Sequence, residues 1–252
     1  MTLIQNFLFN NEFAIVATDT LTKRIEYEID QETGKMLESK ETGRFYTSDK
    51  ARKLTDYVIF SAFGWGDIGD GVFMDLKKEV APQFYLDDCK DLFMEGCRVS
   101  YKTLQDLNLV EGLMSLNSIF IQIVGFNKDG SLGMYQFNAS RGFIMSPELN
   151  DEYPIHIDMI PPSKDLYEKR DSFYSPESVM PMGSPLNTFL GHIIKVQSII
   201  SRVEPEGCSN KCIYHILIKG PDGDIKYIND RADLTEFMAQ LPSKEVLTEL
   251  YK

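Results

Sequence analysis

Short turns separate neighbouring strand-like segments, and this pattern constrains the fold more than any other feature of the sequence. Asn10-Asn11 lies between the apolar runs 3–9 and 13–17, and asparagine is frequent in tight turns because it tolerates left-handed backbone. Asn127–Gly130 has the same place later in the chain, with glycine where a positive φ is needed. Strands joined by such short turns run antiparallel. The sequence therefore predicts mainly antiparallel sheets.

The order of the elements favours a layered α+β fold. Strands are expected at 3–9, 13–17, 24–29, 35–39, 57–62, 118–125, 134–137, 211–218 and 225–228. Apolar residues at helical spacing predict helices at 70–80 and 186–203, further helices at 85–96 and 101–115, and short ones at 233–240 and in the last residues. Two antiparallel sheets with helices outside them fit this order.

Two segments are expected to stand apart within one domain that spans residues 1–252. The segment 24–45 contains a polar hairpin that we expect to project from the body. The segment 146–183 contains six prolines, which predict a long irregular connection that serves as a lid or a partner-facing loop.

Charge and hydropathy exclude several classes of protein. The formal net charge of −12 argues against nucleic-acid binding, because that affinity depends on lysine and arginine neutralising phosphates. The sequence has no apolar run of the roughly 18 residues that a membrane span requires. The start of the chain lacks the basic and apolar regions of a signal peptide. We therefore expect a soluble cytoplasmic protein that contacts neither nucleic acid nor membrane.

The cysteines and histidines form no recognisable metal site. Cysteines occur at 89, 97, 208 and 212 and histidines at 156, 192 and 215, without the spacing of a zinc site. We interpret the cysteines as buried free thiols. Neither a metal nor a cofactor is expected.

The start of the chain offers a possible nucleophile. Removing Met1 would expose Thr2, whose free α-amine can act as the base for its own hydroxyl. Asp19 follows the second expected strand, 17 residues after Thr2. Lys50 precedes Gly64 by 14 residues, and Phe63-Gly-Trp-Gly-Asp67 forms a glycine turn after a buried strand. Each residue alone has a simpler interpretation: a turn aspartate, a solvated lysine, a turn glycine.

In this order and spacing, the set resembles the N-terminal nucleophile hydrolases, specifically their proteasome β-subunit and HslV branch. The resemblance implies a four-layer α/β/β/α sandwich of two antiparallel sheets between helix layers. It also implies that the hairpin at 24–45 is an insertion between Asp19 and Lys50. The sequence departs from the family pattern at Met182, Asn210 and Lys211, and it has Glu206 where the family has aspartate.

The resemblance also implies roles for individual residues. Thr2 would be the nucleophile, Lys50 a buried cation beside it, Asp19 the partner of Lys50, and the Gly64 N–H the oxyanion donor. The remaining implied residues would hydrogen-bond the amine and a water (Ser184, Glu206 and Ser209) or lie against the substrate (Thr20, Thr22 and Gly66).

Three hypotheses follow. The first is a threonine-type hydrolase of amide or peptide bonds, so that the protein's status as an enzyme depends on Thr2. The second is a catalytically inactive proteasome-like scaffold that acts as an assembly or partner-binding module, with the hairpin and the proline-rich loop as partner surfaces. The third is an unrelated α+β protein that matches by chance. Under the first two hypotheses we expect a homo-oligomer or a partner protein.

Overall fold

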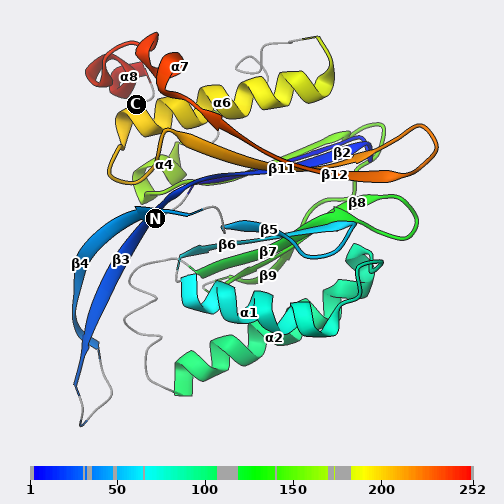
Figure 1. The fold of residues 1–252 in the computed structure, drawn as a ribbon, viewed down its shortest axis with the longest axis horizontal. Coiled ribbons are helices and arrows are strands. Elements are labelled where there is room, and N and C mark those ends of the chain that lie inside the picture. The colour runs from blue at the N-terminus through cyan, green and yellow to red at the C-terminus, as the bar shows by residue number, and fades with distance from the viewer. Residues whose placement is uncertain are drawn as a thin grey trace.

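The computed structural model of the chain (Figure 1) describes residues 3–30, 32, 36–47, 50–64, 66–106, 119–139, 141–169, 173 and 183–250. Its strands form two five-stranded sheets and one two-stranded sheet. The first sheet has the order β10 (Ile155–Ile160), β1 (Ile4–Phe9), β2 (Phe13–Asp19), β11 (Lys211–Lys219), β12 (Ile225–Asp233). The second has the order β5 (Ala51–Lys53), β6 (Val58–Gly64), β7 (Ile119–Phe126), β8 (Leu132–Asn138), β9 (Gly142–Met145).

Helices cover the outer faces of both sheets, as Figure 1 shows. Helices α1 (Gly66–Glu79) and α2 (Leu86–Asp106) lie against the second sheet, and α6 (Pro185–Val203) lies against the first. The short helices α4 (Lys164–Glu168), α7 (Thr235–Ala239) and α8 (Lys244–Leu250) lie on the α6 side. All strand pairs are antiparallel. The expected four-layer α/β/β/α sandwich is confirmed.

Each interface between layers has its own apolar core. Phe60 and Phe93 belong to the core between the second sheet and its helices. Leu8 and Phe126 belong to the core between the sheets, and Phe7 to the core beneath α6. Because successive strand residues point to opposite faces, β1 supplies both of the latter cores. The uninterrupted apolar run 13–17 of β2 follows from the same geometry, since both faces of the strand are buried.

The hairpin of β3 (Leu21–Ile29) and β4 (Met36–Tyr46) forms the two-stranded sheet and projects from the sandwich (Figure 1). It begins two residues after Asp19, so the end of β2 is also the base of the projection. The turn between β1 and β2 agrees with its sequence, because Asn10 and Asn11 have φ values of 46° and 54°, in the left-handed region that asparagine tolerates.

Several element predictions need correction. The expectation of an irregular connection at 146–183 is wrong for 155–160, which form edge strand β10 paired with β1. The helices expected at 85–96 and 101–115 are one continuous helix as far as Asp106, and residues 107–118 lie outside the described residues. Strands β5 and β9 were not expected. These short edges are held by pairing with β6 and β8, and they have little sequence signal of their own.

Candidate functional site

A buried ion pair joins the end of β2 to the start of β5. The Lys50 Nζ lies 2.8 Å from Asp19 Oδ1, and the two side chains are 7% and 0% exposed. Lys50 precedes β5, and its carbonyl accepts the Ala62 N–H of β6 at 3.0 Å. The backbone of the second sheet therefore fixes a lysine against an aspartate of the first sheet.

Asp19 is saturated with hydrogen-bond donors. Its Oδ1 accepts the Leu3 N–H at 2.9 Å in addition to the Lys50 ammonium. Its Oδ2 accepts the Leu21 N–H at 2.8 Å and the Ser209 N–H at 3.2 Å. Three backbone donors and one cation replace the water that burial removes, which is the condition for keeping a buried carboxylate charged. Asp19 thereby connects three segments through its carboxylate: Leu3 just before β1, Leu21 at the start of β3, and Ser209 in the loop before β11.

The electrostatics of the pair follow from burial. Burial lowers the pKa of Lys50 below its ordinary value, while the charge of Asp19 and the hydrogen bond to it act in the opposite direction. The Lys50 ammonium also donates to the Leu21 carbonyl. Nearby Cys208 is fully buried, and burial raises the pKa of its thiol well above the ordinary value. Cys208 therefore stays a thiol and is not a competing nucleophile.

Ser209 is held at the same point by helix α6. The Ser209 carbonyl accepts hydrogen bonds from Gln197 Nε2 at 3.1 Å and from Ser201 Oγ at 2.5 Å. Its hydroxyl accepts the Thr20 N–H at 3.0 Å and lies 3.0 Å from the Thr20 hydroxyl. Two of the predicted residues, Thr20 and Ser209, are therefore in direct contact although 189 positions separate them.

The other residues that the resemblance implied are Gly64, Gly66, Thr22 and Thr2, and none of them has a described hydrogen bond to Asp19 or Lys50. Gly64 ends β6 with a φ of 99°, a conformation that favours glycine. Gly66 begins α1. Thr22 lies in β3, and its buried Oγ1 has no hydrogen-bond partner among the described residues. Thr2 lies outside the described residues, and Leu3, which follows it in sequence, is the first residue held by Asp19.

The structure does not bring Ser184 into the cluster. Ser184 is the N-cap of α6, and its side chain accepts the Asn187 N–H. Ser201, which contacts Ser209, lies 17 residues further along the same helix. At a rise of about 1.5 Å per residue, roughly 25 Å of helix axis separates them. The sequence signal at Ser184 is accounted for by helix capping.

Glu206 also points elsewhere. Its side chain is 71% exposed and pairs with Arg44 of β4. Glu206 thus links the projecting hairpin to the loop before β11, and its ion pair is with Arg44 and not with Lys50. Glu206 lies within the tight turn that the Glu204 carbonyl closes after α6 and is exposed, whereas Ser209 follows this turn and is buried.

Two residues that the sequence analysis did not single out complete the cluster. Gln197 and Ser201 are 0% and 2% exposed, and both donate to the Ser209 carbonyl. Gln197 also donates to the Lys211 carbonyl at 2.9 Å. Their signal was present as polar residues on the apolar side of the predicted helix 186–203, four residues apart and so on one face.

The chemistry that this arrangement supports is limited to charge and hydrogen bonding. It presents a buried cation, a fully bonded carboxylate and a fixed serine beside the start of β1.

Among the described residues, no group of three or more histidine, cysteine, aspartate or glutamate side chains is placed to hold a metal ion. The four cysteines are free and buried, which confirms their interpretation. None of the described helices has the length and apolar character that crossing a membrane requires.

Comparison with known proteins gives a fold but no family by sequence. No protein-family model matches the chain, and no curated protein matches it. Solved structures do match over nearly the whole chain. An Anbu mutant from Hyphomicrobium sp. strain MC1 has a TM-score of 0.55 and 12% identity, covering 99% of this chain and 94% of that one.

Two further Anbu structures give the same result. Anbu, described as an ancestral beta-subunit, from Yersinia bercovieri has a TM-score of 0.55 at 13% identity and covers 96% and 98% of the two chains. The helical assembly of the Anbu complex from Pseudomonas aeruginosa has a TM-score of 0.59 at 14% identity and covers 96% and 97%. At these identities the similarity concerns the fold.

These neighbours correct the expected branch. The resemblance was to the proteasome β-subunit and HslV branch, whereas the three structures described above are Anbu proteins, which form a distinct family. The coarser expectation of the fold holds, because the chain shares its fold with these structures. The finer branch had been inferred from a few spaced residues, and these residues are insufficient to separate one proteasome-like family from another.

Proposed function

We propose that this chain is an N-terminal threonine hydrolase of amide or peptide bonds, with Thr2 as the nucleophile once Met1 is removed. The observation that carries the proposal is the buried Lys50–Asp19 pair, in which Asp19 also accepts the Leu3 N–H at 2.9 Å. A positive charge held beside a hydroxyl and an amine lowers the pKa of both. The pair thus supports activation of the residue that precedes Leu3.

In the proposed reaction, the Thr2 hydroxyl oxygen attacks the carbonyl carbon and its proton passes to the Thr2 α-amine. The Gly64 N–H stabilises the oxyanion, a contribution of about 3 kcal/mol for a well-placed donor. The amine fragment leaves with the proton and an ester to Thr2 remains. A water then hydrolyses the ester and restores the free hydroxyl. Thr20, Thr22 and Gly66 are proposed to lie against the substrate, and the unpartnered Thr22 hydroxyl fits that role.

The decisive experiment combines two measurements. The intact mass of the protein from its native host should correspond to a chain that begins at Thr2. A library of fluorogenic peptide amides should then be hydrolysed by the wild type, while Thr2→Ala should abolish hydrolysis with an unchanged unfolding curve. Thr2→Ser is the matched control, since it keeps a hydroxyl and an amine. Quantitative retention of Met1, or full activity of Thr2→Ala, would contradict the proposal.

A second candidate function is a non-catalytic scaffold of the same fold. The positions of Ser184 and Glu206 favour it, because both residues implied in handling the amine and the water are engaged elsewhere. In that case Thr2, Asp19 and Lys50 matter for stability alone. Hydrolysis of no library member by a chain with a proven Thr2 terminus would select this candidate.

We also propose that the chain forms a homo-oligomer, since one of the matching structures is titled a helical assembly. The projecting β3–β4 hairpin and the segment 146–183 are the surfaces that would contact a neighbour. Analytical ultracentrifugation should find species larger than one 28.8 kDa chain, and a monomer at all concentrations would overturn the oligomer proposal.

A cytoplasmic location fits the four free cysteines and is testable by cell fractionation.

A further inference from the structure

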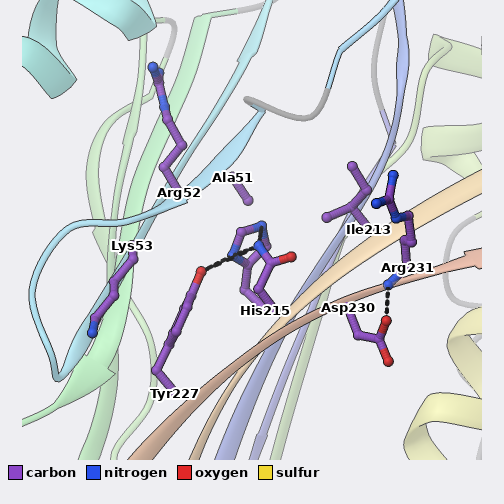
Figure 2. Close-up of a pocket in the computed structure, with 9 residues that line it drawn as sticks. Ala51, Arg52, Lys53, Ile213, His215, Tyr227, Asp230 and Arg231 are labelled. Carbon is purple, nitrogen blue, oxygen red and sulfur yellow. Dashed lines mark hydrogen bonds between the residues drawn. The ribbon is translucent and has the colours of Figure 1, made fainter.

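A cleft of about 510 Å³ opens where the edges of the two main sheets meet. It lies between β5, the edge strand of the second sheet, and β11 and β12 of the first (Figure 2). Its volume is within the range of sites that bind ligands in proteins. The cleft is distinct from the Asp19–Lys50 cluster, whose residues do not line it.

The floor of the cleft is polar and uncharged. His215 of β11 is 2% exposed, and its Nδ1 lies 2.6 Å from the Tyr227 hydroxyl and 3.1 Å from the Asn229 amide nitrogen. Burial lowers the pKa of His215 to about 4, so the imidazole is neutral at pH 7. Figure 2 shows the His215 and Tyr227 side chains meeting from the two strands. The floor therefore offers hydrogen bonds without charge.

Arg231 is one of the charged residues that line the cleft beside this floor. Alternation along β12 puts Tyr227, Asn229 and Arg231 on one face and Asp230 on the other. Figure 2 shows the Asp230 and Arg231 side chains pointing to opposite sides of the strand. Asp230 accepts the Arg231 backbone N–H at 2.8 Å and the Tyr214 hydroxyl at 3.2 Å. Within the part of the chain that the structure describes, the Arg231 guanidinium forms no ion pair.

The other cations that line the cleft are already engaged. Arg52 points to the opposite face of β5, where it pairs with Asp70 at 2.5 Å and lies over the Phe73 ring. Lys53 lies over the Tyr227 ring at 5.1 Å and pairs with Asp56. Arg231 is therefore the lining cation that has no carboxylate partner among the described residues, and Asp230 is the one acidic residue of the lining.

The cleft is also bordered by two strands with an open edge. Among the described strands, β12 pairs only with β11, and β5 only with β6. An open edge presents unpaired backbone N–H and C=O groups that an extended peptide can use. A peptide strand beside β12 would place every second side chain over the cleft, opposite Tyr227, Asn229 or Arg231. Opposite charges favour such cross-strand pairs.

We propose that this cleft binds an extended acidic peptide segment, which pairs along the edge of β12 and places a carboxylate against the Arg231 guanidinium. Backbone pairing supplies the affinity, and the Arg231–carboxylate contact selects acidic sequences, because arginine and carboxylate form charge-assisted, bidentate hydrogen bonds. The neutral floor of His215, Tyr227 and Asn229 accommodates a polar neighbouring side chain.

The test uses full-length protein carrying Thr2→Ala, so that binding is measured whether or not the chain hydrolyses peptides. The probe is a fluorescein-labelled, end-blocked peptide of alternating threonine and glutamate, followed by fluorescence anisotropy. Arg231→Gln should weaken binding by about tenfold or more, the loss typical of a charge-assisted bond. Lys226→Gln is the matched control, since it removes an exposed cation from the opposite face of the same strand and should change affinity less than about twofold.

A second arm separates strand pairing from simple anion capture. The same peptide with N-methylated backbone amides should lose binding, because it cannot pair with a strand edge. Equal binding to wild type and Arg231→Gln would overturn the proposal, as would the absence of measurable binding. If the N-methylated peptide binds as well as its parent and citrate competes with both, the cleft takes small anions and the peptide proposal is wrong.

Discussion

Two lysines three residues apart, Lys50 just before β5 and Lys53 at its end, form ion pairs of nearly equal length in very different surroundings. The Lys50–Asp19 pair measures 2.8 Å and the Lys53–Asp56 pair 2.7 Å. The first pair is 7% and 0% exposed, the second 41% and 52%. A buried pair that loses one partner leaves an uncompensated charge in the protein interior, whereas exposed charges return to water at little cost. Burial, rather than distance, therefore decides which lysine matters to the fold.

The same difference in burial separates the Asp19–Lys50 cluster from the cleft beside Lys53. The Asp19–Lys50 cluster is closed, and its polar atoms are bonded to backbone and to helix α6. The cleft beside Lys53 is open, has a neutral floor and ends at an exposed Arg231. We expect substitutions in the cluster to change stability and substitutions at the cleft rim to change binding.

The largest effect is expected from Asp19→Leu, which keeps the branching and the number of side-chain heavy atoms but removes the charged partner of Lys50. The free energy of unfolding should fall by about 3–5 kcal/mol, because a buried ammonium is left unpaired. Urea unfolding at pH 7 measures this change in the free energy of unfolding. The double variant Asp19→Leu/Lys50→Met should recover much of the loss. No recovery would show that the backbone donors to Asp19, rather than its charge pairing, dominate.

The next effect depends on pH and concerns His215. Its pKa in the folded protein is about 4, below the ordinary 6.5, so the unfolded chain binds more protons between these values. Stability is therefore fully present above pH 6.5 and is lost as the pH falls toward 4. From pH 7 to pH 5 this loss amounts to about 2 kcal/mol. His215→Gln should flatten that part of the urea-unfolding profile, and a profile as steep as the wild type would refute the assignment.

Ser209→Ala should have a smaller effect within the cluster. It leaves the Thr20 N–H without its acceptor in a buried position, which costs about 1–2 kcal/mol. Hydrogen exchange of the Thr20 amide should become faster, since it loses its bond. Ser163→Ala, at a partly buried serine that bonds Glu204 outside the cluster, is the control and should leave the exchange of Thr20 unchanged.

The smallest effect is expected from Lys53→Gln. The exposed pair with Asp56 contributes little, so the free energy of unfolding should change by less than about 0.5 kcal/mol. Urea unfolding in parallel with Lys50→Gln makes the comparison direct. A loss for Lys53→Gln similar to that of Lys50→Gln would break the contrast between the two ion pairs.

Much of the fold could be predicted because its signals are local. The asparagine turn, the apolar runs of β1, β2 and β7, and the apolar face of α6 are each encoded in a few consecutive residues. Edge strand β10 was missed although Ile155–Ile160 alternates apolar and polar residues, because the surrounding prolines outweighed a signal that was present. Strand β5 has three residues, too few for any periodic signal.

The candidate site was likewise predictable only in part. Spacing alone brought Asp19, Lys50 and Gly64 into one hypothesis, and the structure joins the first two directly. Spacing did not distinguish Ser209, which turns inward to Asp19, from Glu206, which turns outward to Arg44. It also placed Ser184 near the site, although a helix of about 25 Å separates them.

The sequence by itself determined the antiparallel sheets, the helix layers, the projecting hairpin and the lysine–aspartate spacing, because turns and periodicity act over short stretches of chain. Only the tertiary structure decided that Gln197 and Ser201 hold Ser209 against Asp19, and that β5 and β12 leave an open cleft between them. Those contacts join residues up to 190 positions apart. They depend on the direction of each side chain after packing, which no local pattern encodes.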